Sequence, residues 1–415
     1  MKLNNVLVAL STAVAMVSPV AAQNLTEDFE RAQTFDPTFQ AAKADYEVAQ
    51  RNVNQAKAVY YPEANISTQR LATDTSSRYS FTVSQPLLDI QRLMILGQAA
   101  PQQLLADVNF QSKSQDLAVR LLKAANAIIL ANETIKLNAT KLDALNQQAQ
   151  AAQRKQQLGL GTITDLRDIE VKANQAKAQQ LSFETQLQNA LKQYQAITGV
   201  TPLANRFALP MTHGGFGLKS LQEYTEAALI SGPNVLAAKY NVEIADYEVK
   251  KLKASLLPVV SAQYSYSKNA GIGISNSYVG LGLSVPLKAG TLYGVGAAEA
   301  TVIKAQETLR ETESKVRLEA DRLVALIASG IEMLKIQRQA IDASELSVEA
   351  NRESYQGGVK TSVDVINAIQ TAYQVKSDYY TMATTQAENI LSLILLAAIK
   401  PQDAVTQTYS YLFAQ

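Results

Sequence analysis

Two kinds of apolar pattern alternate along this chain. Residues 102–158 contain neither glycine nor proline, and apolar residues recur there every seven positions. This seam consists of Leu121, Ile128, Ile135, Leu142 and Ala149, with Leu117, Ala124, Ala131 and Leu145 at the alternate positions and Asn138 as the polar exception. Sustained heptads predict a coiled-coil helix. At about 1.5 Å per residue this helix would extend roughly 85 Å.

The same pattern occurs a second time, so the chain is a duplication. A second apolar seam lies 199 positions later, at Ala320, Ile327, Leu334, Ile341 and Val348. Pro37 and Pro233 head similar segments 196 positions apart, and "SQPL" at 84 matches "SVPL" at 284. The change of offset from 196 to 200 indicates an external loop that is longer in the second copy.

Between the helical stretches the period changes from seven to two. Ala64, Ile66 and Thr68 alternate with polar residues, as do Val260, Ala262 and Tyr264. Such alternation predicts strands, here in hairpins at about 64–86 and about 259–286. Soluble sandwiches use similar strands, but two hairpins between very long helices favour a transmembrane barrel. Four strands cannot close a pore, whereas twelve from three chains leave an aqueous lumen.

The expected organisation has four parts. Residues 1–22 have the charged start, apolar core and small-residue cleavage site of a secretory signal. The first structural repeat spans 23–216 and the second spans 217–400. The tail, 401–415, has no role that its sequence reveals.

Composition removes several classes of function. The formal charge of +1 gives no electrostatic case for a nucleic-acid partner. Cysteine is absent and His213 is the single histidine, which argues against thiolate or imidazole metal sites and catalytic triads. We expect no cofactor, no metal and no enzymatic activity. The longest apolar run after the signal is too short for a membrane helix.

Two heptapeptides punctuate the helical stretches. "GLGTITD" at 159–165 and "GVKTSVD" at 358–364 share the pattern G-x-x-T-x-x-D. With the duplicated helix–hairpin–helix plan and the proline-flanked strands, they make the whole mature chain resemble the TolC family of outer-membrane efflux proteins. The resemblance implies a mainly α protomer that contributes four strands to a trimeric twelve-stranded barrel in the outer membrane. It also implies a long coiled-coil tunnel through the periplasm. Lipid, a periplasmic adaptor and an inner-membrane pump or ABC transporter would be its partners.

In that family the heptapeptides lie at the periplasmic tips, where one helix reverses into the next. We expect Gly159, Gly161, Gly357 and Gly358 to form the turns. Thr162 and Thr361 would cap the returning helices, and Asp165 and Asp364 would lie near their N-termini, where the helix dipole favours a carboxylate. The plainer interpretation is that these residues do nothing more.

The resemblance assigns a gate to residues of both tips. Thr164 and Asp165 match the first tip's gate positions, and Tyr355 and Lys360 match the second's. We expect the Tyr355 phenol to bond Asp165, and Lys360 to pair with Thr164 or Asp165 of a neighbouring chain. The related pattern has arginine at the Lys360 position, and lysine lacks its bidentate fork.

Asp364 and Asn367 are the candidate pore constriction. Threefold symmetry would gather three Asp364 carboxylates, whose repulsion should raise their pKa and attract cations. The related pattern has a second aspartate where this chain has Asn367, so we expect milder cation selectivity. An ordinary solvated carboxylate is the alternative.

The sequence therefore indicates an outer-membrane exit duct of a tripartite export system. Its cargo stays open between small molecules, as in multidrug efflux, and proteins, as in type I secretion. The alternative is a periplasmic structural or adaptor coiled coil without a pore, which would leave the alternating strands unexplained.

Overall fold

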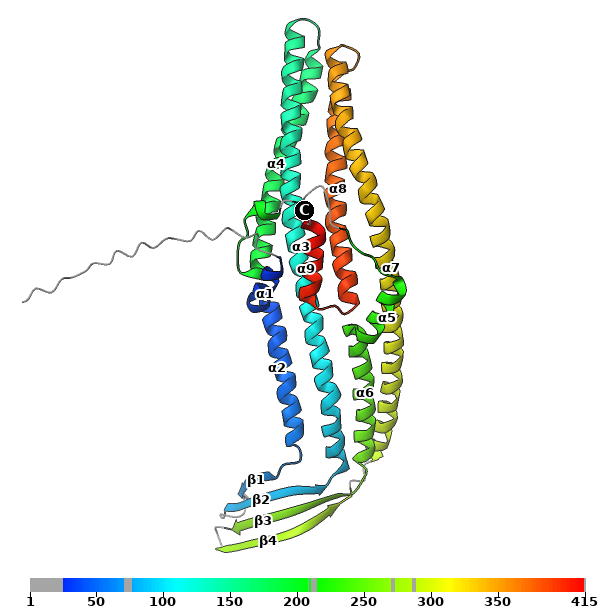
Figure 1. The fold of residues 1–415 in the computed structure, drawn as a ribbon. Helices are drawn as coiled ribbons and strands as arrows, with labels where there is room; N and C mark the ends of the chain where they lie inside the picture. The colour runs from blue at the N-terminus through cyan, green and yellow to red at the C-terminus, as the bar shows by residue number, and fades with distance from the viewer. Residues whose placement is uncertain are drawn as a thin grey trace, which may run out of the picture.

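The protomer is a long column of helices with a small sheet at one end and two helical tips at the other (Figure 1). The computed structural model describes residues 25–70, 77–207, 209, 215–269, 273–285 and 289–413. The predicted signal segment and His213 lie outside the described residues.

Each repeat runs helix, hairpin, long helix and returning helix. The elements of the first repeat are α1 (Leu25–Phe35), α2 (Pro37–Ala58), β1 (Glu63–Arg70), β2 (Ser77–Leu88), α3 (Ile90–Gln157), α4 (Ile163–Thr198) and the short 3₁₀ helix η1 (Ala204–Phe207). Those of the second are α5 (Leu221–Ser231), α6 (Pro233–Ala254), β3 (Val259–Asn269), β4 (Ile274–Ser284), α7 (Ala289–Gln356) and α8 (Ser362–Leu396), and the tail forms α9 (Pro401–Phe413). The predicted fold class and both hairpins are confirmed.

The long helices exceed the expected length. α3 and α7 each have 68 residues, and α3 continues through Gly97 and Pro101, so the expected start at residue 102 was wrong. A side chain at position 97 would place its Cβ 2.6 Å from the ring of Tyr247 on α6. Gly97 therefore permits close packing of α3 on α6, and tertiary contacts override its weak helix propensity.

The four strands form one antiparallel sheet in the order β1-β2-β3-β4. β2 belongs to the first repeat and β3 to the second, and their ladder pairs Phe81 with Tyr266. The sheet therefore joins the two repeats and leaves β1 and β4 as its edge strands. In the described ranges, no helix combines the length and the apolar character needed to cross a membrane.

The core lies in the middle of the column and follows the predicted seams. Leu121 and Ile128 of α3 and Ile327 of α7 are fully buried. Farther along α3, the alternate positions Asn138 and Leu145 are the more deeply buried ones. Asn138 donates to the Ala176 carbonyl oxygen at 2.8 Å, so the polar exception bonds α3 to α4.

The tail, which had no predicted role, is part of this core. α9 packs against α1, α3 and α8, with Tyr411 and Leu412 buried. Thr406 and Thr26 share a 2.8 Å hydrogen bond between α9 and α1. The end of the chain therefore ties the first helix of one repeat to the last helix of the other.

A buried ion pair connects α2 to α3. Asp36 caps α2 by accepting from the Phe39 N–H at 2.7 Å, and it accepts two hydrogen bonds from Arg120 at 2.8 and 3.0 Å. Burial acts to raise the pKa of Asp36, but the Arg120 and backbone hydrogen bonds together lower it. This stabilisation is therefore complete above the ordinary value of 3.8 and is lost as pH falls through the lower folded-state pKa.

We predict that Asp36→Ala lowers the free energy of unfolding by about 2–3 kcal/mol, because it removes both the cap and the ion pair. Asp36→Asn should cost less, since its amide oxygen still caps α2. Denaturant unfolding of the detergent-solubilised protein measures both variants. Equal losses would show that the ion pair, not the cap, carries the effect.

Candidate functional site

The two helical tips lie side by side at the end of the column opposite the sheet (Figure 1). Both helices end in the same way. Gly159 has φ +72° and Gly358 has φ +76°. The Leu160 N–H reaches the Lys155 carbonyl oxygen at 2.8 Å, and the Val359 N–H reaches that of Ser354 at 2.9 Å. These are Schellman turns, in which left-handed glycine ends the helix.

The other two predicted turn glycines behave differently. Gly161 has no positive φ, but a Cβ there would lie 3.2 Å from the Lys155 Cβ, so close packing is its constraint. At Gly357 the nearest atom to an added Cβ is 3.7 Å away, which is ordinary contact. All four glycines lie where the chain leaves the long helices, as expected, and Gly159 and Gly358 are the two that adopt the left-handed conformation.

The predicted threonine caps are confirmed. The Thr162 hydroxyl accepts the Asp165 N–H at 3.2 Å, and the Thr361 hydroxyl accepts the Asp364 N–H at 3.3 Å. Each aspartate accepts in return from its threonine's backbone N–H. The G-x-x-T-x-x-D motif thus encodes a Schellman turn followed by a capping box.

Two polar contacts join one tip to the other. Lys155 Nζ donates to the Tyr355 carbonyl oxygen at 2.6 Å and lies 3.8 Å from the centre of the Tyr355 ring. Ser362 donates its hydroxyl to Asp165 Oδ1 at 3.3 Å. Lys155 and Ser362 were not predicted as site residues, because no sequence signal pairs positions about 200 residues apart.

The expected hydrogen bond between Tyr355 and Asp165 is absent from the protomer. Over the part of the chain that the structure describes, the Tyr355 phenol makes no hydrogen bond, and Asp165 uses its oxygens for Thr162 and Ser362. Burial raises the pKa of Tyr355, and the charge of Asp165 raises it further. The carboxylate is therefore close enough to act on the phenol electrostatically without bonding it.

The remaining predicted residues are divided between the tips, with Thr164 on the first and Lys360, Asp364 and Asn367 on the second. The hydroxyls of Thr164 and Thr162 are 2.8 Å apart. Lys360 Nζ lies 4.0 Å from Asp364 Oδ1, and both side chains are substantially exposed. Asn367 is exposed one helical turn beyond Asp364. The side chains of Lys360, Asp364 and Asn367 are therefore accessible to a neighbouring chain.

Asp364 has a lowered pKa in the protomer, whereas the sequence argument expected a raised one. The backbone and side-chain hydrogen bonds from Thr361 are the main cause, followed by the charge of Lys360. The expected repulsion needs three chains, so it would have to act against this capping effect.

Both tips carry exposed apolar side chains. Leu158 is 73% exposed, Leu160 is 75% exposed and Val359 is 82% exposed. Contiguous exposed apolar surface on a folded protein commonly marks an interaction site. Among the described residues, no group of three His, Cys, Asp or Glu side chains can hold a metal ion.

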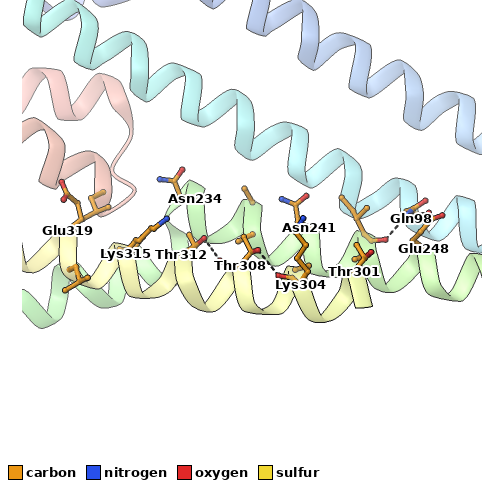
Figure 2. Close-up of a pocket in the computed structure, with 18 of the residues that line it drawn as sticks. Gln98, Asn234, Asn241, Glu248, Thr301, Lys304, Thr308, Thr312, Lys315 and Glu319 are labelled. Carbon is orange, nitrogen blue, oxygen red and sulfur yellow. Dashed lines mark hydrogen bonds between the residues drawn. The ribbon is translucent and has the colours of Figure 1, made fainter. Parts of the chain in front are cut away.

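A separate groove of about 1120 Å³ lies along α6 and α7 (Figure 2). Figure 2 shows Thr301, Thr308 and Thr312 of α7 facing the same space as Asn234 and Asn241 of α6. Hydroxyl and amide groups suit contact with water or polar cargo. Each of these three threonine hydroxyls donates to a backbone carbonyl oxygen four residues earlier in α7.

A model of the outer membrane efflux protein family matches residues 29–200 and 225–398, which together make up more than four-fifths of the chain. The chain belongs to this family. It is therefore an outer-membrane exit duct of a tripartite export system, and its helical tunnel lies in the periplasm. The two matched ranges correspond to the two repeats.

The alignments with related proteins cover most of this chain. Alkaline protease secretion protein AprF of Pseudomonas aeruginosa is 27% identical over 397 residues, covering 86% of this chain and 80% of AprF. Proteases secretion protein PrtF of Dickeya chrysanthemi is 28% identical over 412 residues, covering 89% of this chain and 87% of PrtF. The solved outer-membrane channel OprN shares the fold, with a TM-score of 0.77 and 16% identity over 91% of this chain and 90% of OprN.

We predict that Gly358→Ala destabilises the second tip by about 1–2 kcal/mol, because alanine is strained at positive φ. Gly357→Ala is the matched control and should be close to neutral. Hydrogen exchange of the Val359 amide, which closes the Schellman turn, should become about tenfold faster in Gly358→Ala only. Equal exchange in the two variants would contradict the assignment.

Proposed function

We propose that three copies of this chain form a duct with one twelve-stranded barrel and one helical tunnel. The edge strands β1 and β4 support this assembly, because each has an unpaired side that a neighbouring copy can complete. Channels of this family form trimers. The exposed apolar residues Ile66, Val279 and Leu281 on the strands fit an outer surface in contact with lipid.

The energy for export comes from an inner-membrane pump or ABC transporter, and a periplasmic adaptor connects it to the duct. A passive duct performs no bond chemistry. The exposed Leu158, Leu160 and Val359 offer the adaptor an apolar surface at the tunnel's end.

An exported polypeptide is the first cargo to test, since AprF and PrtF are named for protease secretion. Small molecules are the second cargo class, since the family is named for efflux. Secretion of a protein substrate, compared with drug susceptibility in a deletion strain, distinguishes the two.

The tip is the gate. Thr164, Asp165, Tyr355 and Lys360 hold the tips together in the closed duct, and Asp364 and Asn367 form the constriction. The contact that carries this proposal is the hydrogen bond from Ser362 to Asp165, which joins the start of α8 to the start of α4. The Lys360 ammonium is available to a neighbouring chain, because its ion pair with Asp364 is long, at 4.0 Å, and its side chain is 49% exposed.

We predict that Asp165→Ala raises single-channel conductance in planar bilayers several-fold, because the carboxylate joins the tips and caps α4. Asp168→Ala, an exposed carboxylate one turn farther along α4, is the matched control and should leave conductance unchanged. Equal conductance in wild type and Asp165→Ala would remove Asp165 from the gate. No channel from intact, inserted wild-type trimers would favour the non-pore structural alternative.

We predict that Asp364→Asn lowers the preference for potassium over chloride, since it removes three negative charges from the constriction. Asn367→Asp, the reciprocal control, should raise that preference. Reversal potentials in a salt gradient measure both variants. Unchanged selectivity in both would mean that these side chains are ordinary solvated groups.

A further inference from the structure

The structure contains a contact between Lys155 and Tyr355 that was not among the gate contacts expected from the sequence. Lys155 lies in the last turn of α3, and Tyr355 lies in the last turn of α7. The Lys155 ammonium is 2.6 Å from the Tyr355 carbonyl oxygen and 3.8 Å from the centre of its ring. One side chain therefore binds both the backbone and the ring of the opposite tip.

The environment of the ammonium group favours a cation. The Tyr355 carbonyl is near the negative end of the α7 dipole, where positive charge is stabilised. Its other lone pair accepts the Gly358 N–H at 3.1 Å, so the same oxygen also takes part in the Schellman turn. The Tyr355 ring is only 7% exposed, and a cation over a partly desolvated aromatic face is more strongly attracted than in water.

Gly161 provides the space for this arrangement. A Cβ at position 161 would lie 3.2 Å from the Lys155 Cβ and 3.3 Å from the Gln156 backbone nitrogen. Any side chain there would push against the base of the Lys155 side chain. The glycine therefore lets the chain pass close to the part of α3 from which the Lys155 side chain extends.

The duplication offers an internal comparison. With the 199-residue offset, Ser354 occupies the position of Lys155 and Lys360 occupies that of Gly161. The second tip therefore has no lysine at the end of its long helix and no glycine to accommodate one. The link runs in one direction only, from the first repeat to the second.

We propose that Lys155 is a positioning residue that latches α3 to α7 and holds the tip closed. The latch rests on the proposed gate and extends it. Tyr355 contributes its ring and its carbonyl oxygen, and its hydroxyl has no part in the latch. Opening the duct requires the Lys155 ammonium to leave both the ring and the carbonyl oxygen of Tyr355.

Single-channel recording of intact trimers tests the latch with three variants. Lys155→Met keeps the length of the side chain and removes its charge. Tyr355→Phe keeps the ring and the carbonyl oxygen and removes only the hydroxyl. Arg154→Met is the matched control, because Arg154 is the exposed cation next in sequence and its side chain makes no hydrogen bond or ion pair within the described residues.

The latch predicts about a tenfold rise in the ratio of open to closed time for Lys155→Met, the lower end of the range for a charge-assisted hydrogen bond. Arg154→Met should behave as wild type, and Lys155→Arg should keep the duct closed. Tyr355→Phe, which retains the ring and the carbonyl oxygen, should open the duct less than Lys155→Met. Unchanged trimer content and thermal unfolding in Lys155→Met would exclude a folding defect. Gly161→Ala is a second test that leaves the charge unchanged. Its added Cβ would press on the Cβ of Lys155, so it should also favour opening.

Three results would overturn the latch. In the first, Lys155→Met gates like Arg154→Met while Asp165→Ala opens the duct. That result would reject the latch and leave the proposed gate in place. Tyr355→Phe that opens as much as Lys155→Met would assign the link to the hydroxyl instead. Absence of any wild-type channel would overturn the gate and the latch together.

Discussion

The whole architecture depends on burying an apolar stripe along two helices of 68 residues each. A helix of that length is stable in water only if a neighbour covers its stripe. α4 and α8 return along α3 and α7 for this purpose. Close approach is visible at Gly330 of α7, where Gln386 of α8 donates to the Ile327 carbonyl oxygen at 2.9 Å. The column, the sheet at one end and the tips at the other follow from this pairing.

Packing four helices side by side fixes the electrostatics of the tip. Two helix C-termini and two N-termini meet there, so carbonyl-rich and N–H-rich ends are close together. Asp165 and Asp364 lie at the N-termini and Lys155 at a C-terminus, as the dipoles favour. Links between the tips need little additional structure, since Asp165 and Lys155 already present charges to the neighbouring tip.

Features set by local chemistry were predictable from the sequence, and features set by tertiary geometry were not. The seams, the hairpins and the caps at Thr162 and Thr361 each depend on spacing within a few residues. The start of α3 was misplaced because the packing of Gly97 against Tyr247 is invisible in a local pattern.

In the candidate site, too, the position of residues along the chain was predictable and their contacts across the tips were not. Asp165 and Tyr355 were correctly placed at the tips, but the bond between them was not found. Which side chains meet across the tip depends on the rotation of one coiled coil against the other. A single sequence does not encode that rotation in any readable motif, so Lys155 and Ser362 were missed.

Apolar contacts are distributed unevenly along the column. The largest core joins α1, α3, α8 and α9 at the middle, where the two helical hairpins are packed together. Toward the tips, the hairpins share only small clusters, one around Ile366 and one around Tyr355. Separating the tips therefore breaks a few polar links and little apolar contact, while the seams within each hairpin stay intact. The tail strengthens this asymmetry, because α9 adds contacts at the middle and none at the tip. An opening at the tips, as proposed here, would therefore leave the central core intact.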